Sequence, residues 1–546
     1  MKTKPGGLIV TVLVAFSASV HALAGDVWVD SSQADNSGDG SFGDPYKTIG
    51  FAMFSASSGD TIKLIKGTYD YNVGDNGESF PIDVKSGVSI QGQGSDASSF
   101  PRIGGDANED VTDPGDLITE LFVIEADGSS ATRSDIIISK CRFIAEDNED
   151  WDAPSAARFA VRNGGTIQGC EFKSCYVERS EMNDGMRPDN AAVVVDVGWG
   201  SADVTASYNT IYATARGGIE QRMDGNASDF GNEEYGYVDV TFIGNNILLE
   251  GADTALFGIK VGAVGDVAAA PGSGFLVRGN TVDSSGATGS GGIDIGIDVE
   301  VHTMGGGLVT LAHGDTFIIR NVVKGCSESG IRLRSRDVDS SSAHLSCWDV
   351  DRNEAYENLG AGIEGDWGEV SGSGGGYLNF ETDSNLFVKN GVGIHLHSGE
   401  NANGTATFLN DTVADNGGYG LQLDDLGGGD LKAIINTIMY FNNPSGSYDQ
   451  EGGNYSIPTL TIIERNNWQL LSPLGDNIDS NPLFVNMAGR DFHLDDQSPC
   501  IDEGDDSPRV GVAVGEYDFE ADDRQQDGDG DSEAVVDIGA DEFTPE

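Results

Sequence analysis

The sequence has little positive charge, little proline and no long apolar run beyond its first residues. It holds 31 Lys and Arg against 89 Asp and Glu, which gives a formal net charge of −58. Such an acidic chain is repelled by nucleic acid and by anionic membrane surfaces, so neither is expected as a partner. No later stretch approaches the roughly 20 apolar residues of a membrane-spanning helix. We therefore expect no insertion into a membrane. We also expect the protein to be a monomer.

Cysteine and histidine are also scarce, with 6 and 7 residues respectively. An even number of cysteines permits disulfides in an exported chain. The separations of Cys141 from Cys170 and of Cys326 from Cys347 are close to one repeat, so stacking would favour these pairs. Buried free thiols are the equal alternative.

The N-terminus has the pattern of a secretory signal peptide. Lys2 and Lys4 precede an apolar run from Leu8 to Val20, and the small-residue motif Ala22-Leu23-Ala24 follows. This pattern predicts a signal peptide over residues 1–24, cleavage before Gly25, and a secreted or cell-surface protein.

A repeated unit indicates the fold. From about residue 205 to 440, an Asn and an apolar pair are followed by a polar loop and then by Gly with Ile or Leu, as in "NVVKGCSESGIRLRS" and "NLFVKNGVGIHLHS". Successive units are separated by 25 to 41 residues, which is typical of a solenoid. Their anchoring residues are Asn209, Asn246, Asn280, Asn321, Asn353, Asn385, Asn410 and Asn436.

The strands of the unit identify the type of solenoid. In "GIRLRS" and "GIHLHS", apolar and polar residues alternate with a period of two, which is the pattern of a half-buried strand. The unit contains no amphipathic helical stretch. We therefore predict a β-solenoid in which the Asn anchors hydrogen-bond from turn to turn in a structural role and glycines occupy sharp corners.

The ends of a solenoid need covers, because an open end exposes a strand edge and the core. Ile49, Ala52, Met53 and Ala56 recur at helical spacing and predict an N-terminal capping helix. The expected organisation is an N-terminal cap with the first turns over residues 25–105, parallel β-helix repeats over 106–470, and a closing segment with an Asp-rich loop over 471–546.

Both ends resemble a known group of proteins. "VDSSQADNSGDGSFGDPYKTIGFAM" and "ESFPIDVKSGVSIQGQG" resemble the N-terminal module, of unknown function, of uncharacterised bacterial secreted β-helix proteins near the pectate-lyase-like superfamily. "DSNPLFVNMAGRDFHLDDQSPCIDEGDD" is similar to the closing segment of the same surface proteins. The resemblance implies an all-β, single-stranded right-handed parallel β-helix, and the handedness preference of parallel crossovers agrees.

If the Gly-Ile strands align in register, their outward residues form two columns. The first contains Glu220, Lys260, Asp294, Arg332, Glu364, His395 and Gln422, and the second contains Arg334, Asp366, His397 and Asp424. A ladder of structural salt bridges is one interpretation, because opposite charges on neighbouring strands attract. A substrate groove is the other, because two His, two Arg and several carboxylates fall on four successive turns.

The groove interpretation predicts a carbohydrate-active enzyme, a polysaccharide lyase or a glycoside hydrolase. Its candidate catalytic residues are Arg332, Arg334, Glu364, Asp366, His395, His397 and Asp424. Arg334 and His397 would hold a uronate carboxylate and act as base, while Glu364 or Asp366 would orient the imidazole or act as acid. The ordered motifs of pectin hydrolases are absent. A noncatalytic surface protein that binds an extracellular polysaccharide through the same face is the alternative.

The last part of the sequence predicts a structural calcium site. Asp527, Asp529, Asp531 and Asp537 supply oxygen ligands, with Gly528 and Gly530 between them. The run is not an EF-hand loop, because Ser532 and Ile538 stand where that loop has Gly and Glu. A solvated acidic turn is the alternative.

Overall fold

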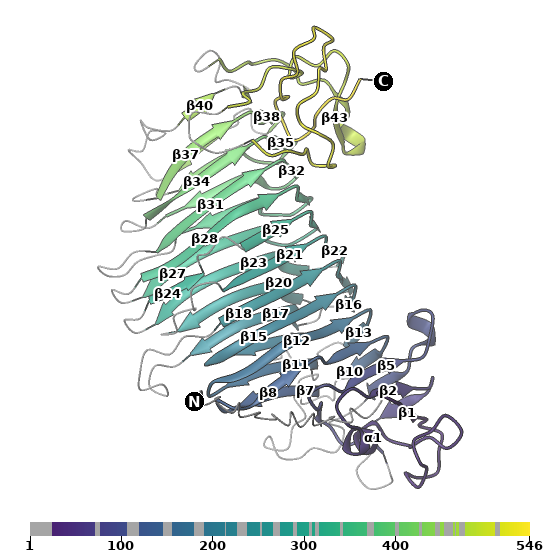
Figure 1. The fold of residues 1–546 in the computed structure, drawn as a ribbon. Helices are drawn as coiled ribbons and strands as arrows, with labels where there is room; N and C mark the ends of the chain where they lie inside the picture. Colours follow the sequence, from purple (N-terminus) through teal and green to yellow (C-terminus); the bar gives the residue numbers. More distant parts are fainter. Residues whose placement is uncertain are drawn as a thin grey trace, which may run out of the picture.

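The chain winds into a long coil in which each full turn adds one strand to each of three parallel sheets (Figure 1). The computed structural model describes residues 24–70, 77–105, 120–145, 155–179, 191–212, 215–225, 237–251, 254–265, 273–287, 292–304, 308–311, 316–338, 342–367, 376–398, 403–424, 429–442, 448–451, 462–464, 466–468, 476–507 and 514–545. The predicted signal peptide, residues 1–24, lies outside these residues except for its last one. Among the described residues, no helix is long and apolar enough to cross a membrane.

The three sheets are here called sheets I, II and III, in the order in which the chain visits them. Sheet I consists, in spatial order, of β1 (Asp26–Val29), β2 (Thr61–Leu64), β5 (Ser89–Gly92), β9 (Ile137–Ser139), β12 (Gly165–Lys173), β15 (Gly200–Ser207), β18 (Tyr237–Ile243), β21 (Gly274–Arg278), β25 (Thr316–Ile319), β28 (Ser342–Asp351), β31 (Tyr377–Asp383), β34 (Asn403–Leu409), β37 (Gly429–Ile435) and β40 (Ile462–Glu464), with β8 (Thr132–Ser134) on β12 and β24 (Leu308–Leu311) on β28.

Sheet II consists of β3 (Thr68–Asp70), β6 (Arg102–Gly105), β10 (Arg142–Ala145), β13 (Tyr176–Arg179), β16 (Thr210–Tyr212), β19 (Asn246–Gly251), β22 (Thr281–Ala287), β26 (Val322–Lys324), β29 (Glu354–Tyr356), β32 (Leu386–Val388), β35 (Thr412–Ala414), β38 (Ile438–Tyr440) and β41 (Asn467–Trp468).

Sheet III consists of β4 (Ile82–Asp83), β7 (Glu120–Asp127), β11 (Ser155–Arg162), β14 (Val193–Val197), β17 (Ala215–Gly225), β20 (Thr254–Gly265), β23 (Gly292–Met304), β27 (Ile331–Val338), β30 (Ala361–Asp366), β33 (Val392–His397), β36 (Leu421–Asp424) and β39 (Tyr448–Glu451). Every pairing in the three sheets is parallel and joins strands one turn apart, apart from the insertions β8 and β24. The fold is the predicted right-handed parallel β-helix.

The core is built from similar apolar side chains that stack at equivalent positions on successive turns of the coil. In sheet II, Ile211, Ile247 and Val282 occupy equivalent inward positions on consecutive turns, and all are fully buried. In sheet III, Ile297, Ile331 and Ile363 do the same. Period-two alternation therefore produces one continuous apolar core, with the polar partners of each strand on the outside.

A ladder of buried amides joins the turns between sheets I and II. The Nδ2 of Asn280 donates to the Oδ1 of Asn321 at 3.0 Å, and the Nδ2 of Asn321 donates to Asn353 at 2.9 Å. The members of this ladder are Asn209, Asn245, Asn280, Asn321, Asn353, Asn385 and Asp411. The predicted structural role of the anchors is confirmed, but three positions are wrong by one residue. Asn245, Asp411 and Thr437 hold the places predicted for Asn246, Asn410 and Asn436, since register and not local sequence selects the residue.

Of the two alternatives for the cysteines, the structure shows the second, because all six are buried free thiols. Cys170 lies in sheet I, whereas Cys141 immediately precedes a strand of sheet II and aligns with Cys175. Cys326 and Cys347 are separated in the same way, since Cys326 follows a strand of sheet II and Cys347 lies in sheet I. A separation of one repeat therefore does not bring these pairs together.

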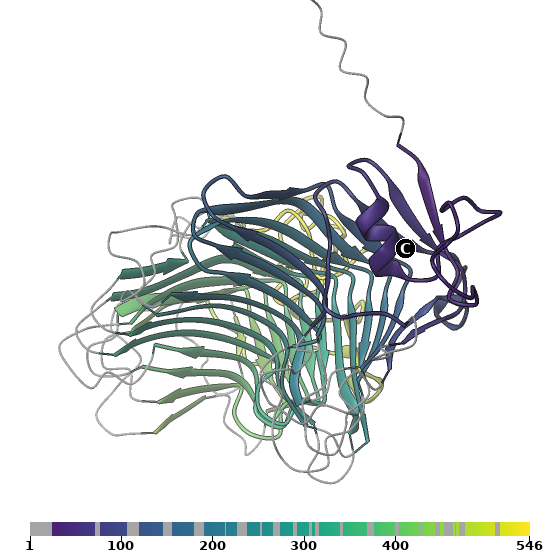
Figure 2. The ribbon, with the colours of Figure 1, turned by 90° about the horizontal axis from the view of Figure 1, so that it is seen from below.

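A short helix, α1 (Ile49–Ser55), lies against β1 and β2 at the N-terminal end of the coil (Figure 2). Ile49, Ala52 and Met53 are buried in the main core, as their spacing predicts. Glu78 accepts hydrogen bonds from the backbone N–H groups of Ile49 and Gly50, which satisfies the first turn. A 3-10 turn, η1 (Ala97–Ser99), follows between β5 and β6.

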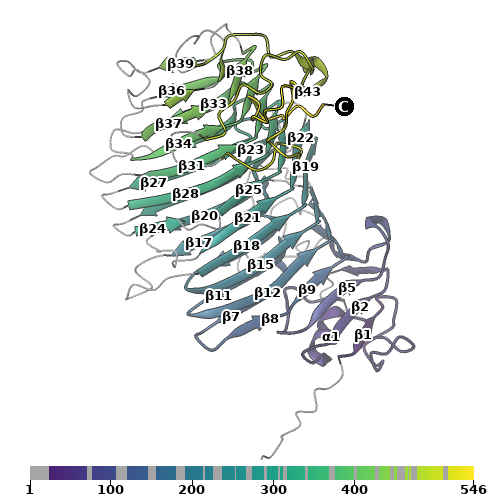
Figure 3. The same cartoon turned by 45° about the horizontal axis from the view of Figure 1, so that its top comes forward.

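The C-terminal segment lies against sheet II at the other end of the coil (Figures 1 and 3). It contains the antiparallel pair β42 (Phe484–Asn486) and β43 (Asp491–Leu494), joined by the 3-10 turn η3 (Met487–Gly489). Phe492 and Ala540 contact a cluster that includes Leu386 and Val388, two outward residues of β32. Outward positions that are polar elsewhere are apolar here because this segment covers them.

Candidate functional site

Hydrogen-bond register brings the predicted columns together on the outer face of sheet III. Arg334 aligns with Asp366, Asp366 with His397, and His397 with Asp424, which is the second column as predicted. In the first column, Arg332 aligns with Glu364, Glu364 with His395, and His395 with Gln422. All seven candidate catalytic residues therefore lie on four adjacent strands, β27, β30, β33 and β36. We call this surface the sheet III strip.

One member of the first column is wrong. Lys260 aligns with Asp298 and Asp298 with Arg332, so Asp294 has no place in the column. The sequence "GIDIGIDV" contains the Gly-Ile motif twice, at Gly292 and Gly296. The second copy takes the register of the neighbouring strands, and sequence alone offers no way to choose between them.

The arginines of the strip form ion pairs with carboxylates on adjacent strands. The guanidinium of Arg332 donates two hydrogen bonds to Asp298, at 2.9 and 3.0 Å. Arg334 lies 3.2 Å from Asp366 and 3.5 Å from Glu300. In this half of the strip the charged groups are largely buried and form salt bridges from strand to strand. This agrees with the interpretation of the columns as a ladder of structural salt bridges.

The histidines form the more open half of the strip. The Nε2 of His395 lies 2.7 Å from the Oδ2 of Asp424, which also accepts from the side chain of Gln422 at 3.1 Å. The Nδ1 of His397 lies 3.4 Å from the Oδ1 of Asp366. The side chains of His395 and His397 are 28% and 31% exposed, so solvent and a ligand can reach both imidazoles.

Glu364 lies between the two halves. Its Oε2 accepts a hydrogen bond from the hydroxyl of Ser329 at 2.5 Å. Together with Asp366, His395, His397 and Asp424 it forms a group of carboxylate and imidazole side chains, the residue types that general acid–base catalysis uses.

Three neighbours of the strip were missed by the sequence reasoning: Glu300, His302 and Arg336. Glu300 aligns with Arg334, and His302 with Arg336. Burial alone would raise the pKa of Glu300, but Lys260 and Arg334 lower it to about 2. Burial lowers the pKa of His302. The sequence did carry a signal for Glu300 and His302. It is the period-two alternation of "IDVEVH", which continues the strand that the Gly-Ile motif marks.

The outer face of sheet III carries further ion pairs beyond the strip, toward the N-terminal end of the coil. Asp196 accepts a hydrogen bond from Arg158 at 2.7 Å and is also paired with Arg162 and Arg222. Burial alone would raise the pKa of Asp196, but these guanidiniums lower it to about 2. Ion pairs between neighbouring strands therefore occur on the outer face of sheet III beyond the strip as well.

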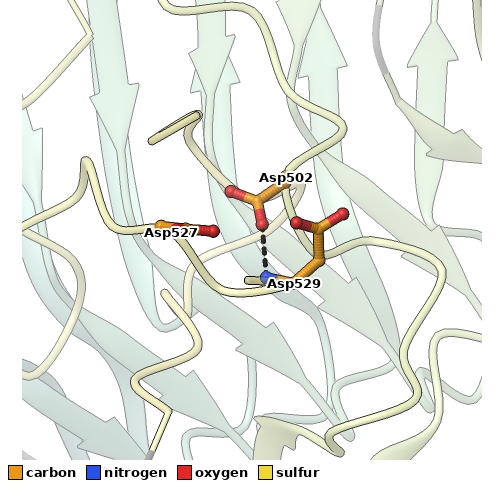
Figure 4. Close-up of side chains that lie close together, drawn as sticks. All are labelled: Asp502, Asp527 and Asp529. Atoms are coloured by element: carbon orange, nitrogen blue, oxygen red, sulfur yellow. Dashed lines mark hydrogen bonds between the residues drawn. The ribbon is translucent and has the colours of Figure 1, made fainter. Parts of the chain in front are cut away.

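The predicted calcium ligands are only partly brought together. The carboxylates of Asp527 and Asp529 meet that of Asp502, with ligand atoms within 4.8 Å of one another (Figure 4). Asp502 also accepts a hydrogen bond from the backbone N–H of Asp529 at 2.7 Å. Burial raises the pKa of Asp502, and the neighbouring charges of Asp529 and Asp527 add to the effect.

Asp531 and Asp537 lie outside this group. The Oδ1 of Asp531 accepts from the N–H of Glu533 at 2.8 Å, which closes the turn. Asp537 is buried and accepts from the N–H groups of Asp502 and Phe543, each at 2.7 Å. Asp502 was missed because it stands well before the Asp-rich loop, and only the folded segment brings it close.

The comparisons with known proteins concern first the N-terminal end. Residues 32–108 match a family model, Protein of unknown function (DUF1565). The DUF1565 match covers α1 and the first turns of the coil, and it confirms the resemblance of this module. No curated protein shows a significant sequence match to the chain.

Among solved structures, the A-module of mannuronan C-5 epimerase AlgE4 from Azotobacter vinelandii is similar with 14% identity and a TM-score of 0.35, covering 78% of this chain and 88% of that one. Pectate lyase Pel9A is similar with 13% identity and a TM-score of 0.33, covering 96% and 97%. The GH136 lacto-N-biosidase from Eubacterium ramulus is similar with 12% identity and a TM-score of 0.38, covering 80% and 67%. Similarity at this level says nothing about the chemistry of the sheet III strip.

Proposed function

We propose that this protein binds and acts on an extracellular polysaccharide along the sheet III strip. The observation that carries the proposal is the pair of imidazole–carboxylate contacts, His395 with Asp424 and His397 with Asp366, on adjacent strands of one face. Salt-bridge stacking alone does not need two partly exposed imidazoles side by side. We also propose export through the signal peptide, which agrees with a substrate outside the cell.

The chemistry proposed is proton transfer to and from a sugar. Asp366 and Asp424 contact the imidazoles and hold them in fixed orientations. One histidine then acts as general base and the other as general acid on opposite groups of the bound sugar. Arg334, beside Asp366, is the group that would bind a uronate carboxylate, which makes lyase chemistry the first to test and glycoside hydrolysis the second.

The test is a screen of the mature protein against uronate and neutral polysaccharides, with unsaturated products followed by ultraviolet absorbance and new reducing ends followed chemically. The double variant His395→Ala with His397→Ala is expected to lower any turnover by about a hundredfold or more. Arg222→Ala is the matched control, because it removes a charged residue from the same face well outside the site. Turnover that survives the double substitution would show that the catalytic site lies elsewhere in the protein.

A noncatalytic glycan-binding protein is the second candidate function. The ion pairing of Arg332 and Arg334 with Asp298, Glu300 and Asp366 favours it, because paired groups are already stabilised without a substrate. Binding of a polysaccharide to the strip, with no product from any substrate in the screen, would select this candidate.

We further propose that Asp502, Asp527 and Asp529 hold a structural calcium ion. The Oδ1 of Asp527 is buried and accepts no hydrogen bond from the described residues, and carboxylate oxygens are the ligands that calcium prefers. Calcium is expected to raise the melting temperature of the wild-type protein but not that of Asp529→Asn. Asp531→Asn is the control, because its carboxylate lies outside the group. An equal response in Asp529→Asn would exclude this site.

A further inference from the structure

The corner between sheets I and II, on the side of the coil away from sheet III, has one residue per turn in the left-handed backbone region. These residues directly precede the ladder position, and each has a φ between 50° and 63°. In order along the coil they are Lys140, Ser174, Tyr208, Gly244, Gly279, Arg320, Arg352, Ser384, Asn410 and Asn436. Successive members are about 4.8 Å apart, the spacing of neighbouring strands.

Arginine collects at one stretch of this corner. The N–H of Gly279 donates to the carbonyl of Ile319 and that of Arg320 to the carbonyl of Asp351, which places Arg278, Arg320 and Arg352 on adjacent turns. Partial burial lowers the pKa of Arg320, and the positive charges of Arg352 and Arg278 lower it further. The three guanidiniums therefore form a local positive field on a strongly acidic protein.

These arginines differ from those of the sheet III strip in their pairing. Arg278 and Arg320 are exposed, and neither forms a salt bridge with another described residue. Arg352 lies 5.9 Å from the ring of Tyr517 and is partly balanced by Asp349 and Asp351. Arg278 and Arg320 are thus the two charges available to an anion.

An aromatic side chain stands at the other end of the same stretch. The ring of Tyr208 is 65% exposed and lies over Gly244, where a Cβ would be 2.8 Å from two ring carbons. A Cβ at Gly279, the next corner, would contact nothing within 4 Å. Because neither glycine has a side chain, the surface between the tyrosine ring and Arg320 is left uncovered at these two positions.

We propose that the corner formed by Tyr208, Gly244, Gly279, Arg278 and Arg320 is a binding site for an acidic polysaccharide. The tyrosine ring stacks on the face of one sugar, and the guanidiniums bind carboxylate or sulfate groups of the sugars that follow. A polysaccharide chain with at most a few charges per sugar can be bound by two arginines. Duplex DNA, with a charge about every 1.7 Å, needs many more cations than the two arginines of this corner supply.

This site is separate from the sheet III strip and does not depend on the proposed catalysis. Screening restricts the field of the corner to about 8 Å at physiological salt, so the net charge of −58 does not prevent local binding of an anion. The corner would hold the polymer while the strip, on the other side of the coil, acts on it or on another chain.

The test measures binding of the mature protein by calorimetric titration with three polymers of matched length: a polyuronate, a sulfated polysaccharide and a neutral polysaccharide. Arg278→Ser and Arg320→Asn are each expected to weaken binding of the acidic polymers two- to fivefold. Tyr208→Asn should weaken it comparably, and binding should fall as salt is added. Preference for one acidic polymer identifies the anionic group.

Lys140→Asn is the matched control, because Lys140 occupies the same corner position, with the same backbone conformation, several turns away. Asn is compatible with the fold at this position, since Asn410 and Asn436 adopt it with φ values of 50° and 52°. Equal loss in the Lys140 variant, unchanged binding in the arginine variants, or equal binding of the neutral polymer would overturn the proposal. So would preferential binding of duplex DNA or anionic vesicles. If the protein shows no turnover but still binds the acidic polymers at the corner, the result contradicts only the catalysis proposed for the sheet III strip.

Discussion

Asp411 occupies a position that asparagine holds in the preceding turns of the buried ladder. Its Oδ1 accepts from both the backbone N–H and the Nδ2 of Asn385, each at 2.9 Å. Its Oδ2 accepts from the hydroxyl of Thr382 at 2.5 Å. Burial raises the pKa of Asp411 to about 7, although these hydrogen bonds lower it in part.

Replacing Asp411 with Asn should stabilise the protein above neutral pH. A raised carboxyl pKa means that the folded state binds the proton more tightly than the unfolded state. Its stabilisation is complete below the unfolded value and disappears as pH rises through about 7. Asn has no charge to bury, so Asp411→Asn is expected to gain up to a few kcal/mol near pH 8 and little near pH 4.

The measurement is the melting temperature of wild type and variant across this pH range. Asn385→Asp is the matched control, since it introduces a buried carboxylate one turn away and should change stability in the opposite direction. A wild type and an Asp411→Asn variant with parallel pH profiles would contradict the interpretation.

Among single residues, the sequence predicted most of the ladder but not its end. Asn280, Asn321 and Asn353 follow from the repeat, whereas Asp411 stands beside Asn410 and is indistinguishable from it by pattern. The choice depends on which of the two side chains faces the turn below, and that is a property of register.

One buried cation contributes to holding the C-terminal segment on the coil. Arg524 is 1% exposed and donates to the hydroxyl of Ser384 and to the carbonyls of Gly539 and Ala540, at 2.9 to 3.0 Å. It therefore joins the loops of the segment to the corner of β31. This contact links residues more than 100 positions apart, and no local pattern indicates it.

Substitution of Arg524 by Ala should release the C-terminal segment without unfolding the coil. Removing the cation leaves the buried carbonyls of Gly539 and Ala540 without this donor. It also leaves the carboxylate of Glu542, 3.8 Å away, without its ion-pair partner. The expected cost is about 3–5 kcal/mol. Hydrogen exchange should increase in residues 484–545 and stay slow in sheets I to III.

Arg490→Ala is the control for this prediction, because Arg490 lies on the same segment over the ring of Tyr356 but is 37% exposed. Its loss is expected to cost about 1 kcal/mol or less. Uniform exchange across the whole chain in the Arg524 variant would show that segment and coil unfold together.

At the scale of the element, the strands of the sheet III strip were predictable because each carries its own period-two alternation. The columns they form were predictable wherever one Gly-Ile motif marks each turn, as at Ile331, Ile363 and Ile394. The prediction failed at β23, where two motifs compete. A ladder of ion pairs was one of the two interpretations, but the partner of each arginine could not be predicted, because it depends on side-chain directions across three or more strands.

The whole molecule carries its charge unevenly. The sheet III strip balances its arginines with carboxylates, the corner with Arg278 and Arg320 is positive, and the remainder is strongly acidic. Since like charges repel over about one Debye length, the folded coil is destabilised by its own net charge of −58.

Monovalent salt is therefore expected to raise the melting temperature of the whole protein. An increase of several degrees is expected between about 10 and 500 mM sodium chloride, because screening shortens the range of repulsion from about 30 Å to less than 8 Å. Thermal unfolding followed by circular dichroism measures it. Sulfate would also strengthen burial of apolar surface, so chloride is the appropriate anion. A falling melting temperature would show that ion pairs outweigh the repulsion.

The sequence by itself determined the coil, because period-two alternation, regular Asn and Gly positions and an apolar inner residue on each strand are local signals repeated many times. It also determined that His395, His397, Arg334 and Asp366 fall on one face. Only the tertiary structure decided which residues pair, that the six cysteines are free thiols, and that Asp502 joins Asp527 and Asp529. These outcomes depend on contacts between turns and between distant segments, whose geometry is set by hydrogen-bond register and loop length and not by any single stretch of chain.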